Sequence, residues 1–118
     1  MDNATLEPFT ITERTIRERT VALDVTGEID IATAPKLREA IEAQASQNQE
    51  RILLNLEKVD YMDSTGLSAI IKGNSAVEET NGKLVLVAPK QRITRLLQIT
   101  GLEERLTVSA SEEEALSL

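Results

Sequence analysis

Two short and nearly continuous apolar runs, at residues 52–56 and 84–88, place the strongest constraint on the fold. Runs of this length are typical of strands that are covered on both faces of a sheet. Residues 64–80, which lie between them, carry apolar side chains at helical spacing and end at a turn signal, Asn81-Gly82. Two buried strands joined by an amphipathic helix predict a strand–helix–strand unit of an α/β protein.

The residues before this unit predict an opening pair of strands. Residues 9–12 alternate weakly between apolar and polar side chains, and residues 21–26 alternate clearly. The charged stretch 13–19 is expected to join the two strands. Gly27 is expected to end the second strand, so that residues 28–30 begin a loop.

The loop is expected to lead into a helix over residues 35–46. Thr33 can cap the amino end of this helix, and Pro35 suits its first turn. Leu37, Ile41 and other apolar residues recur at helical spacing, so that one face of the helix is suited to a sheet.

Three further elements are predicted after the second buried strand. Pro89 opens a helix, Gly101 ends it, a short strand is expected near residues 106–108, and residues 111–116 resemble a capped last helix. The elements then follow the order ββαβαβαβα. This order predicts one α/β domain over residues 1–118, in which a mixed central sheet packs with about four helices.

The composition excludes most hydrolytic chemistry. The chain has no Cys and no His, so it lacks the side chains of Ser-His triads, Cys-His dyads and ordinary zinc sites. A net charge of −7 opposes nucleic-acid phosphates and anionic lipid headgroups, and favours a basic or neutral protein partner. No apolar run approaches a membrane span, and the first residues lack the features of a secretory leader. We therefore expect a cytoplasmic binding protein without a metal or other cofactor.

Two hydroxyl groups, those of Ser64 and Thr65, lie where the first buried strand gives way to the amphipathic helix. The tetrapeptide 63–66 is by itself an ordinary helix start, because Asp and Ser are preferred caps. The amino end of a helix also tolerates a phosphoryl group, because its backbone N–H groups are unpaired and its dipole is positive there. Both hydroxyls are therefore candidate phosphoryl acceptors.

Three segments in this order resemble the STAS family, and most closely its single-domain branch, the bacterial anti-sigma factor antagonists. Residues 27–30 resemble the Gly-Glu-Leu-Asp loop of the family, residues 62–67 match its phosphorylation loop, and residues 99–102 resemble the segment after its third helix. The resemblance covers nearly the whole chain. It implies the STAS fold and a regulatory binding function without enzymatic activity.

The resemblance also implies a phosphorylation switch. A serine kinase of the histidine-kinase-like ATPase class, which is also the anti-sigma factor, would phosphorylate Ser64, with Thr65 as the alternative acceptor. The unphosphorylated form would bind this kinase and release the sigma factor, and a PPM-type serine phosphatase would restore Ser64. The partner contacts implied by the family are Asp30, Asp63, Ser64, Thr65, Gly66 and Leu67. The residues alone give Asp30 an equally good role as a turn-stabilising side chain.

Two other functions remain open at this point. A phospho-aspartate receiver with a magnesium site would use Glu28 and Asp30 after one strand, Asp63 after another and Lys90 after a third. The acids do not form the adjacent pair of a receiver, and Asp63 falls at a helix start, which speaks against this function. The second alternative is an accessory STAS interaction domain in a stressosome-like or transporter complex, which would have the same fold.

Overall fold

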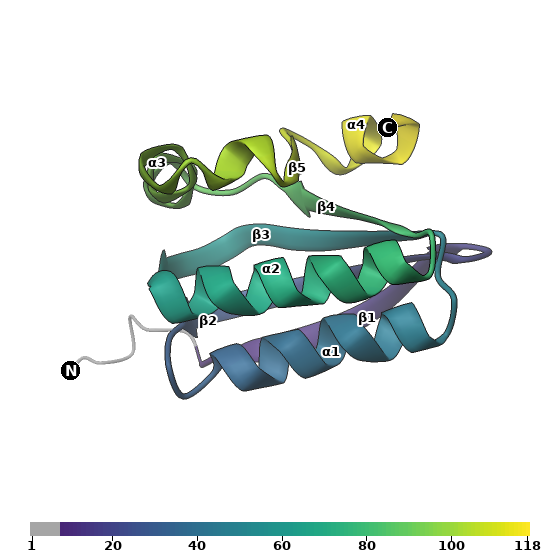
Figure 1. The fold of residues 1–118 in the computed structure, drawn as a ribbon, viewed down its shortest axis with the longest axis horizontal. Coiled ribbons are helices and arrows are strands. Elements are labelled where there is room, and N and C mark those ends of the chain that lie inside the picture. The colour runs from purple at the N-terminus through teal and green to yellow at the C-terminus, as the bar shows by residue number, and fades with distance from the viewer. Residues whose placement is uncertain (1–7) are drawn as a thin grey trace.

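Five strands form one sheet, and their order in space follows their order along the chain, β1-β2-β3-β4-β5. The computed structural model describes residues 8–118 and is drawn in Figure 1. The strands are β1 (Thr10–Arg17), β2 (Thr20–Ile29), β3 (Arg51–Met62), β4 (Lys83–Val87) and β5 (Thr107–Ser109). β1 and β2 pair antiparallel, whereas the pairs from β2 to β5 are parallel. The predicted mixed sheet is therefore confirmed.

Four α-helices alternate with the strands after β2. They are α1 (Ala34–Ser46), α2 (Ser64–Glu79), α3 (Gln91–Thr100) and α4 (Glu112–Ser117), and a short 3₁₀ helix, η2 (Leu102–Glu104), follows α3. This arrangement confirms the predicted order ββαβαβαβα. None of the helices within residues 8–118 has the length and apolar character needed to cross a bilayer.

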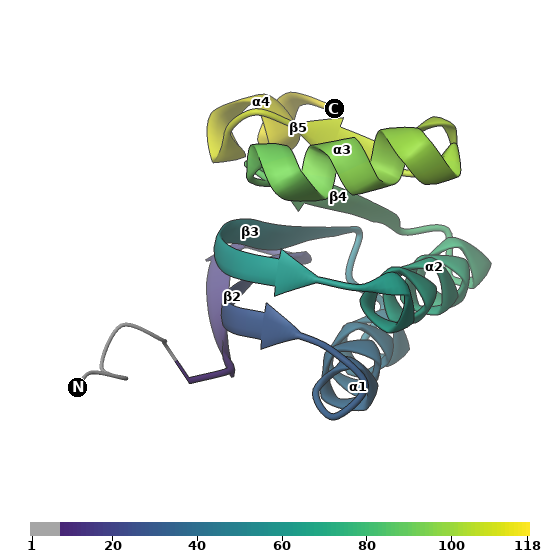
Figure 2. The same cartoon turned by 90° about the vertical axis from the view of Figure 1, so that its left-hand side faces the viewer.

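The two faces of the sheet are covered differently. α1 and α2 lie side by side on one face, where their apolar side chains form the main core with those of β2, β3 and β4 (Figures 1 and 2). On the other face a smaller cluster joins Ala22, Leu53 and Val85 of the sheet to Ala115 of α4. The predicted apolar strands β3 and β4 are thus buried on both faces where their apolar runs lie.

Arginine side chains fasten α4 to the sheet. The Nη1 group of Arg51 donates to the carbonyl oxygen of Leu116 at 2.5 Å. Arg14 donates to Asp24 at 2.9 Å and to Glu112 at 2.8 Å, so one guanidinium joins β1, β2 and α4. This guanidinium also holds the pKa of the Asp24 carboxyl below its usual range.

The connection predicted over the charged stretch 13–19 is wrong. β1 continues to Arg17, and the turn is limited to Glu18 and Arg19, where Arg19 has a φ of 60°. β1 is an edge strand with mostly exposed side chains, and charged side chains are common on such edges because they oppose pairing with other chains.

Gly27 does not end β2, contrary to the prediction. It lies inside the strand with a φ of 91°, next to a register irregularity between β2 and β3. A Cβ at this position would lie 2.9 Å from the backbone of Phe9, so the close approach and the positive φ both require glycine. Glu28 and Ile29 belong to the strand, and the loop begins at Asp30.

The end of β3 and the start of α3 differ from their predicted positions. β3 continues beyond Leu56 to Met62, because two register irregularities, each with one extra residue on β3, let Val59 and Met62 turn toward the core. Pro89 precedes α3 by two residues, and Lys90 is the residue that caps it. The predicted extents of α1, α2, β4 and α4 are confirmed to within about two residues.

Candidate functional site

The loops that follow β2 and β3 meet at one edge of the sheet. The two strands are parallel, and Ile29 and Met62, their last residues, are register partners. The backbone N–H of Asp63 donates to the carbonyl oxygen of Ile29 at 3.3 Å, which ties the two loops together. Asp30 and Asp63 therefore follow neighbouring positions at the end of the molecule that faces the viewer in Figure 2.

Asp63 caps the amino end of α2. Its Oδ1 atom accepts hydrogen bonds from the N–H of Thr65 at 2.9 Å, from the N–H of Gly66 at 3.3 Å and from the hydroxyl of Thr65 at 2.5 Å. The Thr65 hydroxyl and these backbone donors hold the pKa of the Asp63 carboxyl below its usual range. The helix start predicted from the tetrapeptide is confirmed, and the cap carries a negative charge at neutral pH.

The two candidate hydroxyls have different surroundings. Ser64 is exposed, and its hydroxyl has no hydrogen-bond partner in the described part of the chain. Thr65 is half-buried, and its hydroxyl is engaged with the carboxylate of Asp63. A phosphoryl group on Ser64 would break no hydrogen bond of the described residues, whereas one on Thr65 would displace the hydrogen bond from its hydroxyl to Asp63.

Gly66 and Leu67 are buried beneath this turn. A Cβ on Gly66 would lie 2.6 Å from Cγ of Met62 and 2.7 Å from Cγ2 of Ile29, so α2 starts directly against the ends of β3 and β2. Leu67 is 3% exposed and belongs to the main core. Neither residue offers a side chain at the surface, and both fix the position of Ser64.

Asp30 stabilises its own loop. Its Oδ1 atom accepts from the N–H groups of Ala32 at 3.0 Å and Thr33 at 3.2 Å, as in the turn-forming role considered above. The hydroxyl of Thr33 donates to the carbonyl oxygen of Glu28 at 2.9 Å and makes no side-chain cap to α1. Thr33 thus occupies the predicted N-cap position of α1, where its carbonyl oxygen accepts from Lys36 and Leu37, but its hydroxyl closes the preceding loop and does not cap the helix.

An exposed apolar side chain at this edge was not predicted from the sequence. Ile31 is 77% exposed and follows Asp30 directly. With Thr65 and Ala69 it lines a groove of about 440 Å³ between α1 and α2. An isoleucine inside a loop, after the inward-facing pattern of β2 has ended, is the signal that could have identified it. An exposed apolar side chain close to the start of α2 is the kind of residue that can contact a protein partner.

Of the residues named for a receiver site, Asp30 and Asp63 follow adjacent strand ends, but Glu28 and Lys90 are engaged elsewhere. The ammonium group of Lys90 donates to Asp60 at 2.5 Å, and Glu28 lies within β2. Among residues 8–118, no three His, Cys, Asp or Glu side chains are close enough to one another to hold a metal ion. This arrangement does not favour magnesium-dependent phosphorylation of Asp63.

The Asp63 cap gives a testable dependence of stability on pH. We expect Asp63→Ala to lower the free energy of unfolding by about 1 kcal/mol at neutral pH. The folded pKa is lowered, so the contribution of the carboxylate is complete above its unfolded pKa of about 3.9 and is lost as the pH falls through the folded pKa. Urea unfolding of both proteins between about pH 7 and about pH 3 should show the difference shrinking in acid.

Glu39→Ala is the control for this measurement, because Glu39 is an exposed acid of α1. We expect this variant to remain within about 0.5 kcal/mol of the wild type at neutral pH. A difference between wild type and Asp63→Ala that grows in acid would contradict a charged cap at Asp63.

The sequence matches the family model of the STAS domain over residues 12–115. The chain is 34% identical over 101 residues to a Staphylococcus aureus protein named anti-sigma-B factor antagonist, with 86% of this chain and 94% of that protein covered. It is 36% identical over 96 residues to the Bacillus subtilis protein of the same name, with 81% and 87% covered.

The fold is similar to that of SpoIIAA, an anti-sigma factor antagonist and cell fate determinant of Bacillus whose structure has been solved unphosphorylated and phosphorylated. The TM-score is 0.76 for the unphosphorylated form, at 25% identity, with 91% of this chain and 93% of that chain covered. For the phosphorylated form the TM-score is 0.70, at 25% identity, with 92% and 97% covered. Sequence and fold point to the same group of proteins.

Proposed function

Because the chain belongs to the STAS-domain family of anti-sigma factor antagonists, we propose that it is such an antagonist and that it works by partner switching. The unphosphorylated protein binds an anti-sigma serine kinase of the histidine-kinase-like ATPase class, and the sigma factor is released. Phosphorylation of Ser64 ends this binding, and a PPM-type serine phosphatase reverses it. The chain, as one STAS domain over residues 1–118, acts in the cytoplasm by binding and catalyses no reaction.

The observation that carries this proposal is the free and exposed hydroxyl of Ser64 at a helix start. Thr65, the alternative acceptor, already uses its hydroxyl to complete the cap made by Asp63. The amino end of α2 accommodates an added phosphate without unfolding, because its backbone N–H groups and dipole favour anions. SpoIIAA, which is 25% identical to this chain, has a solved phosphorylated form, and this supports the proposal that the chain is phosphorylated too.

The charge of the site explains how one phosphate ends binding. Asp30 and Asp63 already make this edge acidic, and a phosphoserine would add about −1.5 to −2 charges between them and the partner. A loss of a few kcal/mol at one interface corresponds to about a hundredfold or more in affinity. The side chains that face the partner are those of Ser64, Thr65 and the two acids, and Ile31 adds an apolar contact. The buried residues Gly66 and Leu67 hold the turn in place.

Two steps test the proposal. Lysate proteins retained on Ser64→Ala and Ser64→Glu baits are first identified by mass spectrometry, and the serine kinase held by the Ala bait alone is purified. With ATP, this kinase is then expected to phosphorylate the wild-type protein and Thr65→Ala, but not Ser64→Ala. Phosphopeptide mapping locates the phosphate.

Two outcomes contradict the proposal. Equal retention of the same proteins on both baits would exclude a binding switch at Ser64 and favour the accessory-domain alternative. Phosphate on Thr65 in the wild-type protein would assign the switch to the other hydroxyl.

A further inference from the structure

A segment of the chain around α3 is basic, although the protein as a whole is acidic. Between Glu79 and Glu103 the sequence holds four Lys and Arg residues and neither Asp nor Glu, in a chain with a net charge of −7. The four cations are Lys83, Lys90, Arg92 and Arg95. This stretch of the chain is therefore positively charged, and two of its four cations, Arg92 and Arg95, lie on α3.

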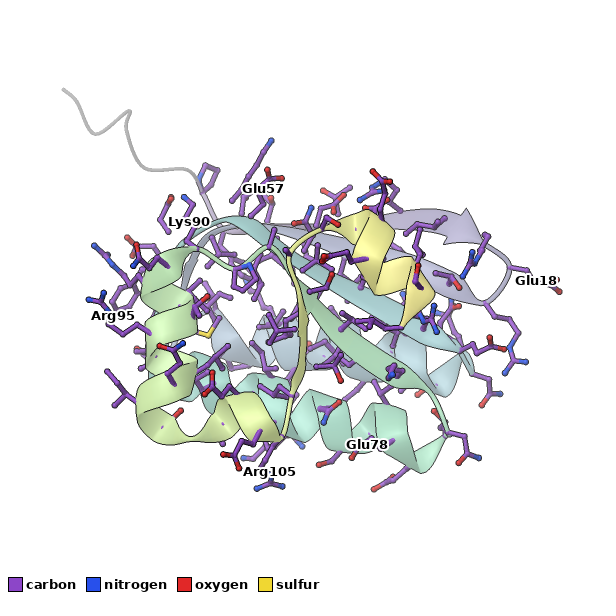
Figure 3. All side chains as sticks on the ribbon, turned by 90° about the horizontal axis from the view of Figure 1, so that it is seen from above. Glu18, Glu57, Glu78, Lys90, Arg95 and Arg105 are labelled. Atoms are coloured by element: carbon purple, nitrogen blue, oxygen red, sulfur yellow. The ribbon has the colours of Figure 1, made fainter. Side chains whose placement is uncertain are left out.

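α3 presents a stripe of basic and apolar side chains to solvent. Ile93 and Leu97 are each 1% exposed and face the core. Arg92, Arg95 and Ile99 follow at intervals of three and four residues, and such positions share one face of a helix. Both arginines are exposed, and Ile99 is 75% exposed. Figure 3 shows Arg95 pointing away from the body of the molecule.

The two arginines of the stripe, Arg92 and Arg95, have no ion-pair partner among the residues that the structure describes that would explain their place on α3. Lys90 is neutralised by Asp60, but no carboxylate of residues 8–118 lies within 4.0 Å of the guanidinium group of Arg92 or Arg95. Arg92 lies in the first turn of α3, where the helix dipole disfavours a cation. An exposed isoleucine beside two unmatched arginines is the composition of an interface rather than of a solvated helix face.

The stripe lies at the same end of the molecule as Ser64. β4 is parallel to β2 and β3, so its carboxyl end leads into α3 at the edge where Asp30 and Asp63 follow their strands. Figure 1 shows α3 and the start of α2 at this same end. One partner can therefore cover both surfaces.

We propose that Arg92, Arg95 and Ile99 form a second binding surface, which receives an acidic segment of the anti-sigma kinase with an apolar side chain against Ile99. The proposal rests on the partner-switching function proposed above and specifies the chemistry of the partner. The Ser64 edge is acidic and the α3 stripe is basic, so the partner must present basic and acidic patches side by side. Two patches of opposite sign fix the orientation of binding, because the reversed orientation opposes like charges.

The test measures the affinity of the purified kinase for variants of the full chain, by calorimetry. We expect Arg95→Glu to weaken binding at least about tenfold at low salt, and by less at high salt, because screening reduces charge repulsion. Ile99→Ser should weaken binding by about fivefold or more at either salt concentration, because it removes an apolar contact. Lys83→Glu is the matched control, since it makes the same change in charge at the start of β4 and should stay within about twofold of wild type.

Two further measurements keep the outcomes distinct. Circular dichroism tests whether each variant is folded. If the reversed charge of Arg95→Glu unfolds the protein, Arg95→Gln is measured in its place. If Arg95→Glu and Lys83→Glu have the same affinity for the kinase while Ser64→Glu no longer binds it, the stripe on α3 is not a binding surface and the proposed function stands. If the kinase does not bind the wild-type protein, the proposed function fails and this inference fails with it. The wild-type protein is also tested for binding to RNA and to phosphatidylglycerol vesicles. If Arg95→Glu abolishes such binding but leaves kinase binding unchanged, the stripe binds another class of ligand and the proposal is overturned.

Discussion

Ser64→Glu is expected to weaken binding to the proposed anti-sigma kinase by about a hundredfold or more, while the Tm stays within about 2 °C of the wild-type value. The substitution places a negative charge at the amino end of α2, beside Asp63 and on the edge that also carries Asp30. The exposed Ser64 side chain makes no hydrogen bond within residues 8–118 that the substitution would break. Calorimetry measures the affinity, and differential scanning fluorimetry measures the Tm.

Ser75→Glu is the matched control for this prediction. Ser75 is also an exposed serine of α2, but it lies near the opposite end of the helix from Ser64. The substitution introduces the same charge, so it separates a local effect at Ser64 from an effect of net charge. We expect its affinity to remain within about threefold of wild type. If Ser64→Glu lost binding together with a large fall in Tm, Ser64 would be a structural residue of the helix start rather than a switch.

Gly66→Ala is expected to lower the free energy of unfolding by about 1 to 3 kcal/mol. The same substitution in an open helix position stabilises a protein by about 0.5 to 1 kcal/mol, so the predicted sign is opposite to the usual one. The reason is the close packing beneath the turn, where the new Cβ would lie 2.6 Å from Cγ of Met62 and 2.7 Å from Cγ2 of Ile29. Urea unfolding followed by circular dichroism measures the change.

A double variant identifies the cause of this destabilisation. If the new methyl group collides with Ile29, then Gly66→Ala combined with Ile29→Ala should cost less than the sum of the two single substitutions, by about 0.5 kcal/mol or more. Ser75→Ala, at an exposed position of the same helix, should change stability by about 0.5 kcal/mol or less. A stabilising effect of Gly66→Ala would show that the ends of β2 and β3 have room for a methyl group.

The interior of the fold could be predicted from the sequence because its signal is local. Leu37 and Ile41 repeat at helical spacing in α1, and β3 and β4 contain continuous apolar runs. The ends of strands could not be predicted, because they depend on residues far along the chain. The backbone of Phe9 lies against Gly27 inside β2, and Arg14 of the charged stretch in β1 is paired with Asp24 and Glu112. Neither contact is visible in the local pattern of the sequence.

Only part of the candidate site could be predicted from the sequence, because the rest also depends on contacts made in the folded chain. The tetrapeptide 63–66 predicts a helix start with two hydroxyls, but the sequence contains no sign that Thr65 donates to Asp63 while Ser64 stays free. Ile31 was missed because its exposure follows from how the loop after Asp30 is folded. The stripe on α3 is visible as a periodicity, yet its position at the Ser64 end follows from the parallel pairing of β4.

The order of the strands has a consequence for the synthesis of the protein. Because the spatial order is β1-β2-β3-β4-β5, no strand has to enter between two strands that are already paired. As the chain leaves the ribosome, each new strand finds its neighbour already made and adds to a single growing edge. An incomplete chain therefore exposes one apolar edge at a time to chaperones, and the turn that carries Ser64 is complete before the last two strands have been translated.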